Sequence, residues 1–167
     1  MNDIRGSGAL IERYEQENAE IEAEHGVAPP MHRLTFDVEK LKDRVITRDK
    51  LAPLCESPIE IALGTDIVVE LRHILIEHGI KLRPQYRWQR WRMDFAMIKA
   101  GAPVLFIECD GREYHSTPEQ LANDKRKDDA AAAAGIPLLR FGGVEIYKYT
   151  DGCVHRVLEY LVRVGAV

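Results

Sequence analysis

The chain has 167 residues, of which 46% are hydrophobic and 30% are charged, and its formal net charge is −4. This length and composition predict one globular domain with a real core, and no apolar run approaches the roughly 20 residues that a membrane-spanning helix needs. The first residues lack the basic and then apolar layout of a signal peptide. Three cysteines without a CxxC pair argue against a disulfide framework or a zinc cluster. We therefore expect a cytoplasmic protein with no membrane partner.

The N-terminal part of the chain is acidic, because its first 27 residues carry seven acidic side chains against two basic ones. Residues 9–25 predict an acidic helix that ends before the Pro29-Pro30 pair. Apolar side chains at helical spacing predict a second helix over residues 34–50. We expect residues 1–50 to form a helical extension that pairs two copies of the chain or binds a partner protein.

Residues 51–167 have the pattern of a separate domain, and its first helix has a clear start. Ser57-Pro58-Ile59-Glu60 places a capping residue, a proline and a glutamate as in a capping box. The helix that begins there is expected to run for about twenty residues, to Gly79. Two strand-like runs follow, around residues 84–90 and 91–99, and then a turn over residues 100–103.

The second half of this domain predicts a strand, a helix, a strand and a helix. Val104 to Asp110 (VLFIECD) is an apolar run typical of a buried central strand. Thr117 opens a helix that continues through the alanine run at 130–134. A short strand over 136–141 and an amphipathic helix over 151–164 complete the chain. The order α-β-β-β-α-β-α predicts a mixed α/β fold, because the last strand can rejoin the sheet only through a crossover helix.

Three acidic residues stand where strands end. Glu108 and Asp110 are two positions apart, so they point to the same face of their strand. Asp94 lies inside an apolar strand, where an acid is costly unless it is paired or binds a cation. If the turn at 100–103 makes a hairpin, the three carboxylates come together and would suit a hard cation such as Mg²⁺. Two alternatives stay open: acid–base chemistry on a sugar, and surface acids that end two strands.

Residues 81–92 (KLRPQYRWQRWR) hold five cations and three aromatic side chains but no acid. This composition is typical of a surface that contacts phosphates, and it equally fits the solvated face of a strand. The aromatic side chains are compatible with stacking on nucleic-acid bases or with packing in the core.

Several motifs occur together between residues 57 and 162: SPIE…QYRW…MDFAM…VLFIECDG…YH…DKRKDDAAAAAGIPLLRF. This combination resembles the very-short-patch-repair-like endonucleases and their uncharacterised bacterial relatives, a branch of the PD-(D/E)XK nucleases. The resemblance implies a restriction-endonuclease-like core over residues 51–167. It also implies Mg²⁺-dependent hydrolysis of phosphodiester bonds in DNA, with Mn²⁺ able to substitute.

The resemblance assigns roles to four motif positions. Asp94 matches the strand aspartate of the family, and Glu108 matches its metal-binding acid. The main-chain carbonyl of Cys109 would be a further ligand. Asp110 occupies the place of the motif's usual lysine, and this is a departure, since an aspartate cannot orient the attacking water or stabilise developing charge as a lysine does.

Other residues are candidates to replace that lysine. Related branches with an acid at this place use a histidine and a helix residue, which here would be His115, Asp124, Lys125 or Lys127. A solvated loop histidine and a surface ion pair are the alternative interpretations. Glu60 would be an outer ligand or a water-positioning acid, or it serves as a capping residue alone.

The resemblance and the basic segment together predict a nucleic-acid surface, formed by Arg83, Gln85, Arg87, Arg90 and Arg92. The departure at Asp110 keeps a second function open, namely an inactive nuclease-fold module that binds nucleic acid or a partner protein. A third alternative is an RNA-cleaving enzyme.

Overall fold

The computed structural model describes residues 38–111 and 117–167. Its helices are α2 (Val38–Leu51), α3 (Pro58–Glu70), α4 (Arg72–Glu77), α5 (Pro118–Ala133) and α6 (Gly143–Arg163), with a short 3₁₀ turn at Ala52–Leu54. Its strands are β1 (Ile80–Trp88), β2 (Trp91–Lys99), β3 (Ala102–Asp110) and β4 (Leu138–Gly142). No helix of the described residues is long and apolar enough to cross a membrane.

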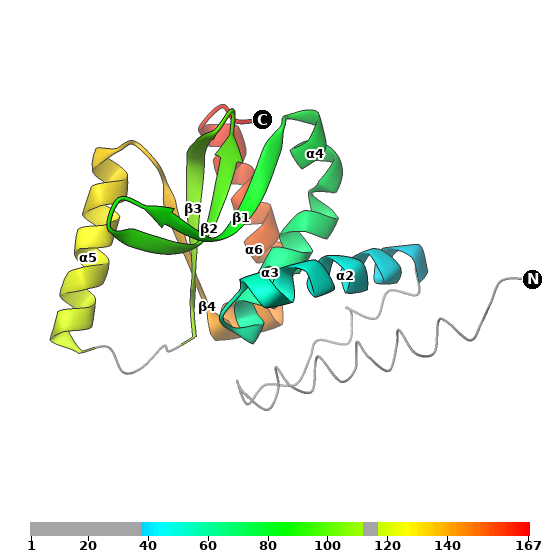
Figure 1. Cartoon of the computed structure of the whole chain (residues 1–167), viewed down its shortest axis with the longest axis horizontal. Helices are drawn as coiled ribbons and strands as arrows, with labels where there is room; N and C mark the ends of the chain where they lie inside the picture. Colours follow the sequence, from blue (N-terminus) through cyan, green and yellow to red (C-terminus); the bar gives the residue numbers. More distant parts are fainter. Residues whose placement is uncertain (1–37, 112–116) are drawn as a thin grey trace, which may run out of the picture.

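The four strands form one mixed sheet in the order β1-β2-β3-β4 (Figure 1). Strand β2 pairs antiparallel with both β1 and β3, and β4 pairs parallel with β3. Helix α5 makes the crossover between β3 and β4, as parallel neighbours require. The predicted mixed sheet with a helical crossover is therefore confirmed.

Helices cover both faces of the sheet, and each face has its own cluster of buried side chains. Helices α3 and α6 pack on one face, where the larger cluster gathers around residues such as Leu63, Phe95 and Val157. Helix α5 packs on the opposite face, where Ala131 meets Phe106 in a smaller cluster. The sheet thus separates α5 from α3 and α6, which is also visible in Figure 1.

Capping residues set two helix starts that position the site. The Ser57 hydroxyl accepts a hydrogen bond from the Glu60 amide at 3.3 Å, and Thr117 and Gln120 form a complete capping box at the start of α5. The Glu60 carboxylate differs from the expected box, because it accepts from the Ser57 hydroxyl and from the Glu56 amide. Glu60 therefore ties the loop before α3 to the helix start.

The β1–β2 hairpin changes faces near its middle. Pro84 pairs with Phe95 and Tyr86 pairs with Met93, so Gln85 and Asp94 lie between these pairs. Phe95 belongs to the cluster under α3 and α6, whereas Met93, two residues away on the same strand, belongs to the cluster under α5. Gln85 has a φ of +48°, outside the range of a regular strand. The distal half of the hairpin is consequently turned toward α5 (Figure 1).

Several predicted boundaries were wrong. The helix expected to run to Gly79 is two helices, because the backbone at Leu71 leaves the helical range. Strand β1 begins at Ile80, four residues before the predicted start. The last helix begins at Gly143, eight residues early, because Ile146 and other residues before the predicted start are buried in the core; a non-helical Tyr149 interrupts it. The predicted helix at 9–25 lies outside the described residues.

Candidate active site

Glu108, near the end of β3, is the centre of a buried polar cluster. The residue is 6% exposed, and its Oε2 atom accepts a hydrogen bond from Lys127 Nζ at 2.5 Å. Its Oε1 atom accepts from the backbone amide of Asp94 at 3.2 Å. Burial raises the pKa of Glu108, and the hydrogen bond and charge of Lys127 oppose that rise. Glu108 thus links β3 to both β2 and α5.

Asp94 lies beside Glu108 on the neighbouring strand. The adjacent register pair joins Phe95 to Ile107, and Asp94 Oδ2 accepts a hydrogen bond from the Cys109 amide at 2.7 Å. Burial, and then the charge of Glu108, raise the pKa of Asp94 to about 7. The two acids therefore occupy one poorly solvated site, in which the carboxylate of Glu108 disfavours the charge of Asp94.

The Glu60 carboxylate extends this cluster from α3. Glu60 is buried, and its Oε2 atom accepts a hydrogen bond from Gln85 Nε2 at 2.7 Å. The charge of Glu60 contributes to the raised pKa of Asp94. The Oε1 atom of Gln85 is buried and has no hydrogen-bond partner among the described residues. An unsatisfied buried acceptor carries a free-energy cost, so it is a position where a ligand or water would be stabilised.

Lys127 reaches the cluster from α5. The residue is 9% exposed, which means that its aliphatic stem is covered while its ammonium group meets Glu108. Ala131, one helical turn further along, packs against the sheet and holds the same face of α5 in place. Of the two candidate lysines on this helix, Lys127 joins the cluster, whereas Lys125 is exposed and pairs with Asp129.

Asp110 lies apart from the buried pair. Its carboxylate is about half exposed and lies 3.5 Å from the guanidinium of Arg140 on β4. In the described part of the chain, no group of three or more His, Cys, Asp or Glu side chains converges as a metal site. The expectation that three carboxylates come together is therefore wrong for Asp110, because Arg140 draws this side chain toward β4.

Arg140 is a site residue that the sequence analysis missed. It is in register with Glu108, and its guanidinium lies 2.9 Å from Asp128 and 3.9 Å from Asp124 on α5. The charge of Arg140 also lowers the pKa of Glu108, against the larger effect of burial. Its strand position next to Glu108 was the available signal, but the pairing of β4 with β3 had to be known first.

Cysteine chemistry is not favoured at this site. Burial, followed by the charges of Glu60 and Asp94, raises the pKa of the Cys55 thiol to about 12. Burial and the charge of Asp94 likewise raise the pKa of Cys109. Both thiols therefore stay protonated at neutral pH, and a protonated thiol is a poor nucleophile. The smaller part of both shifts comes from the negative charges of Glu60 and Asp94.

The basic segment lies mainly on the exposed surface of the hairpin. Arg83, Arg87 and Arg90 are exposed, and Arg92 forms an ion pair with Glu56 at 2.5 Å. Gln85, by contrast, is partly buried and directed at Glu60.

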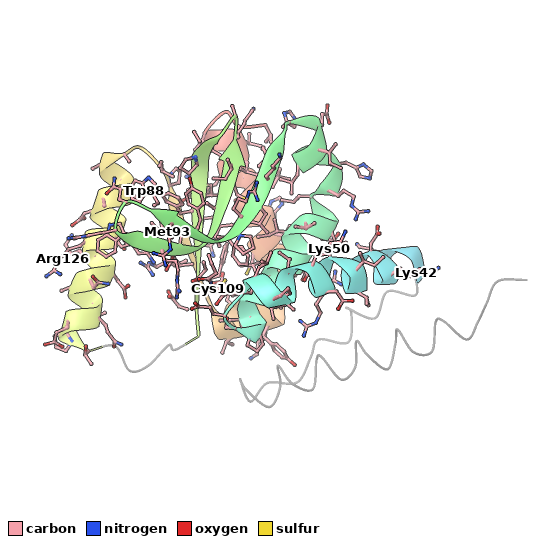
Figure 2. All side chains as sticks on the ribbon, in the orientation of Figure 1. Lys42, Lys50, Trp88, Met93, Cys109 and Arg126 are labelled. Atoms are coloured by element: carbon pink, nitrogen blue, oxygen red, sulfur yellow. The ribbon has the colours of Figure 1, made fainter. Side chains whose placement is uncertain are left out.

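The aromatic side chains of the segment pack toward α5: Trp91 is buried there, and Tyr86 and Trp88 are partly buried against the same cluster. The ring of Trp88 lies 5.0 Å from that of Phe106, and Tyr86 also packs against this ring. Figure 2 shows Trp88 and Met93 on the part of the hairpin near α5. The predicted His115 falls outside the described residues.

Comparison with known proteins identifies a family that matches this chain. Residues 68–161 match the REase_MTES_1575 family. A search of curated proteins finds no match. Among solved structures, the catalytic domain of the homing endonuclease I-Bth0305I is similar, at 20% identity and a TM-score of 0.42. The similarity covers 59% of this chain and 95% of that domain.

Proposed function

Because the chain belongs to the REase_MTES_1575 family of restriction endonuclease-like proteins, we propose that it is a Mg²⁺-dependent endonuclease that hydrolyses phosphodiester bonds in DNA. The contact between Lys127 and Glu108 beside Asp94 is the observation that carries this proposal. Two acids and one lysine are the groups that the PD-(D/E)XK resemblance implies, and here a helix provides the lysine.

The donor atoms of the cluster fit a hard divalent cation. Asp94 and Glu108 offer carboxylate oxygens, Cys109 offers a main-chain carbonyl, and Gln85 offers a buried amide oxygen without a partner among the described residues. Oxygen donors are those that Mg²⁺ and Mn²⁺ prefer. Asp94, Glu108 and the Cys109 carbonyl would hold the cation. The chemistry that such a cation supplies when bound is a lowered pKa of a water molecule and neutralisation of charge on the reacting phosphate.

Lys127 would contribute what the motif lysine contributes in the family. Its ammonium group is fixed beside Glu108 at the edge of the acid pair, so a phosphate bound there would lie within its reach. A fixed ammonium group stabilises negative charge that develops on the phosphate oxygens, and it orients a water molecule by donating hydrogen bonds. The aspartate at position 110 therefore does not remove this chemistry from the chain.

Glu60 acts through another residue in this proposal. Its carboxylate accepts a hydrogen bond from the amide nitrogen of Gln85 and thereby fixes the orientation of that amide group. The exposed Arg83, Arg87 and Arg92 of the hairpin would bind backbone phosphates, which gives affinity without sequence specificity. The expected roles of Asp124 and Asp110 are modest, since both carboxylates lie near Arg140.

A cleavage assay with purified protein tests the proposal. End-labelled single-stranded, double-stranded and mismatched DNA and an RNA of matched sequence are incubated with Mg²⁺, with Mn²⁺ or with EDTA. We expect cleavage of DNA that requires the cation and is lost in Glu108→Gln. The matched control is Glu159→Gln, an exposed acid on α6, which should cleave as the unchanged protein does.

The outcomes separate the candidate functions. Cleavage of RNA alone would assign the enzyme to the RNA-cleaving class. Binding without cleavage under every metal condition would identify an inactive module and contradict the proposal. Undiminished cleavage by a correctly folded Glu108→Gln variant would remove the buried cluster from the reaction.

A further inference from the structure

The tip of the β1–β2 hairpin has an unusual turn residue. Trp88 pairs with Trp91, which leaves the two exposed residues Gln89 and Arg90 as the turn. Gln89 has a φ of +54°. Glycine and asparagine are the usual residues in this left-handed conformation at a two-residue turn. Turn propensity therefore does not account for a glutamine here.

On the exposed face of the same hairpin, two positively charged side chains lie opposite each other. Arg87 and Arg92 are direct cross-strand partners. Like charges at such positions destabilise a sheet. Glu56 compensates Arg92 on one side, while Arg87 is exposed. An anion that bridges these two guanidinium groups would relieve their repulsion, so the pair fits a phosphate.

The opposite face of the hairpin anchors it. Met93 belongs to the cluster between the sheet and α5, and the partly buried Tyr86 and Trp88 pack against that cluster. The guanidinium of Arg90 stacks 4.5 Å above the Trp91 ring, which restricts the orientation of its donor groups. The hairpin is thus a two-stranded ribbon with one buried face, one basic face and an ordered polar tip.

Building on the proposed function, we propose that this ribbon, residues 86–93, lies in the major groove of duplex DNA. The major groove is about 12 Å wide and admits a two-stranded β-ribbon. Arg87 and Arg92 contact phosphates, while Gln89 and Arg90 contact base edges. Glutamine pairs through two hydrogen bonds with adenine and arginine with guanine, so these two side chains determine sequence preference.

The geometry of the hairpin sets the distance between the bases that are read and the bond that is cut. Asp94 is four positions along the chain from the turn residue Arg90, which is roughly 13 Å along a strand. Base pairs stack about 3.4 Å apart, so the contacted bases lie about four base pairs from the scissile phosphate. Duplex RNA should bind the ribbon poorly, because its major groove is too deep and narrow to admit the hairpin.

Binding measured without cleavage tests the proposal. Fluorescence anisotropy in EDTA compares duplex DNA, single-stranded DNA and duplex RNA on the Glu108→Gln protein. We expect duplex DNA to bind at least about tenfold more tightly than the other two ligands. Arg87→Ala should lower the slope of log affinity against log salt by about one, whereas Arg163→Ala, an exposed arginine at the end of α6, should not change it. Equal or tighter binding of single strands or of duplex RNA would overturn the proposal.

Selection from a randomised DNA duplex tests the two tip residues. The unchanged hairpin should enrich a short motif, and Arg90→Ala and Gln89→Ala should each lose preference at one position by about tenfold or more. Arg90→Lys keeps the positive charge but loses the planar, forked set of hydrogen-bond donors of the guanidinium. It should therefore keep the salt dependence of binding and lose the base preference. Selection of no motif, or of the same motif by all variants, would overturn the assignment. Because no cleavage is measured, a failed nuclease assay leaves this result standing.

Discussion

The Nζ atom of Lys127 on α5 lies 2.5 Å from Oε2 of Glu108 on β3, although 19 positions separate the two residues in the chain. The motif of the PD-(D/E)XK nucleases places its lysine two residues after the acid, where this chain has Asp110. The crossover helix brings a lysine to the acid by another route. The fold therefore assembles in space a combination that the local sequence lacks.

Removal of this ammonium group is the first test of that relationship. We expect Lys127→Gln to lower kcat for DNA cleavage by roughly 10²-fold or more, because a positioned charged group is lost from the reacting phosphate. The protein should stay folded, since glutamine can still donate a hydrogen bond to Glu108. Cleavage rates at saturating DNA, together with circular dichroism, provide the measurement.

Lys125 on the same helix provides the matched control. It is exposed and pairs with Asp129 instead of the cluster. Lys125→Gln should therefore leave kcat unchanged. If both lysine variants lose activity equally, then the loss reflects the charge of α5 and not the contact with Glu108.

The pairing of Asp94 with Glu108 predicts that a substitution at Asp94 increases stability and abolishes activity. Burial and Glu108 disfavour the charged form of Asp94, whose pKa is about 7. Asp94→Asn removes this charge and retains an oxygen acceptor for the Cys109 amide. We expect the free energy of unfolding to rise by about 1 kcal/mol at pH 8, while cleavage is lost.

Urea denaturation in EDTA measures this change. Asp129→Asn, which alters an exposed acid, should leave the free energy of unfolding unchanged within about 0.5 kcal/mol. A lower midpoint for Asp94→Asn would mean that the carboxylate stabilises the fold, and would contradict the electrostatic account of the site.

Much of the fold could be predicted from local patterns. Ser57 and Thr117 mark helix starts by side-chain capping, which needs only neighbouring residues. The apolar run before Asp110 indicated the buried strand β3 for the same reason. The break at Leu71 and the early start of α6 were missed because tertiary packing, and not local propensity, decides where these elements end.

The candidate site could be predicted only in part. Asp94 and Glu108 were identifiable because acids in apolar strands are costly. The position of Asp110 depends on Arg140, which becomes its neighbour only when β4 pairs with β3. The exchange of faces at Gln85 likewise depends on a backbone conformation that glutamine rarely adopts. Such non-local features are not encoded in spacing along the chain.

Close packing behind the site leads to a further prediction. A Cβ atom at Gly64 on α3 would lie 2.9 Å from the ring of Phe95, the neighbour of Asp94. Gly64→Ala should therefore lower the free energy of unfolding by about 1–3 kcal/mol, because the ring must move in a filled core. Gly152→Ala on α6 is the matched control, since its nearest neighbour would be 3.9 Å away. The free energy of unfolding of that variant, measured by urea denaturation, should rise by about 0.5–1 kcal/mol. Equal effects of the two substitutions would show that the core beside Asp94 is not tightly packed.

Arg140 should affect catalysis through the position of α5. Its guanidinium forms an ion pair with Asp128, and Lys127 of the same helix forms one with Glu108. Two ion pairs of opposite polarity therefore join α5 to the sheet. Arg140→Gln should loosen this arrangement and lower kcat by about tenfold, with less change in KM. A double-mutant cycle provides the measurement: in a Lys127→Gln background, the same Arg140 substitution should have little further effect on kcat. Full additivity of the two substitutions would mean that Arg140 acts independently of Lys127, for example by binding the substrate itself, and the positioning role would then be excluded.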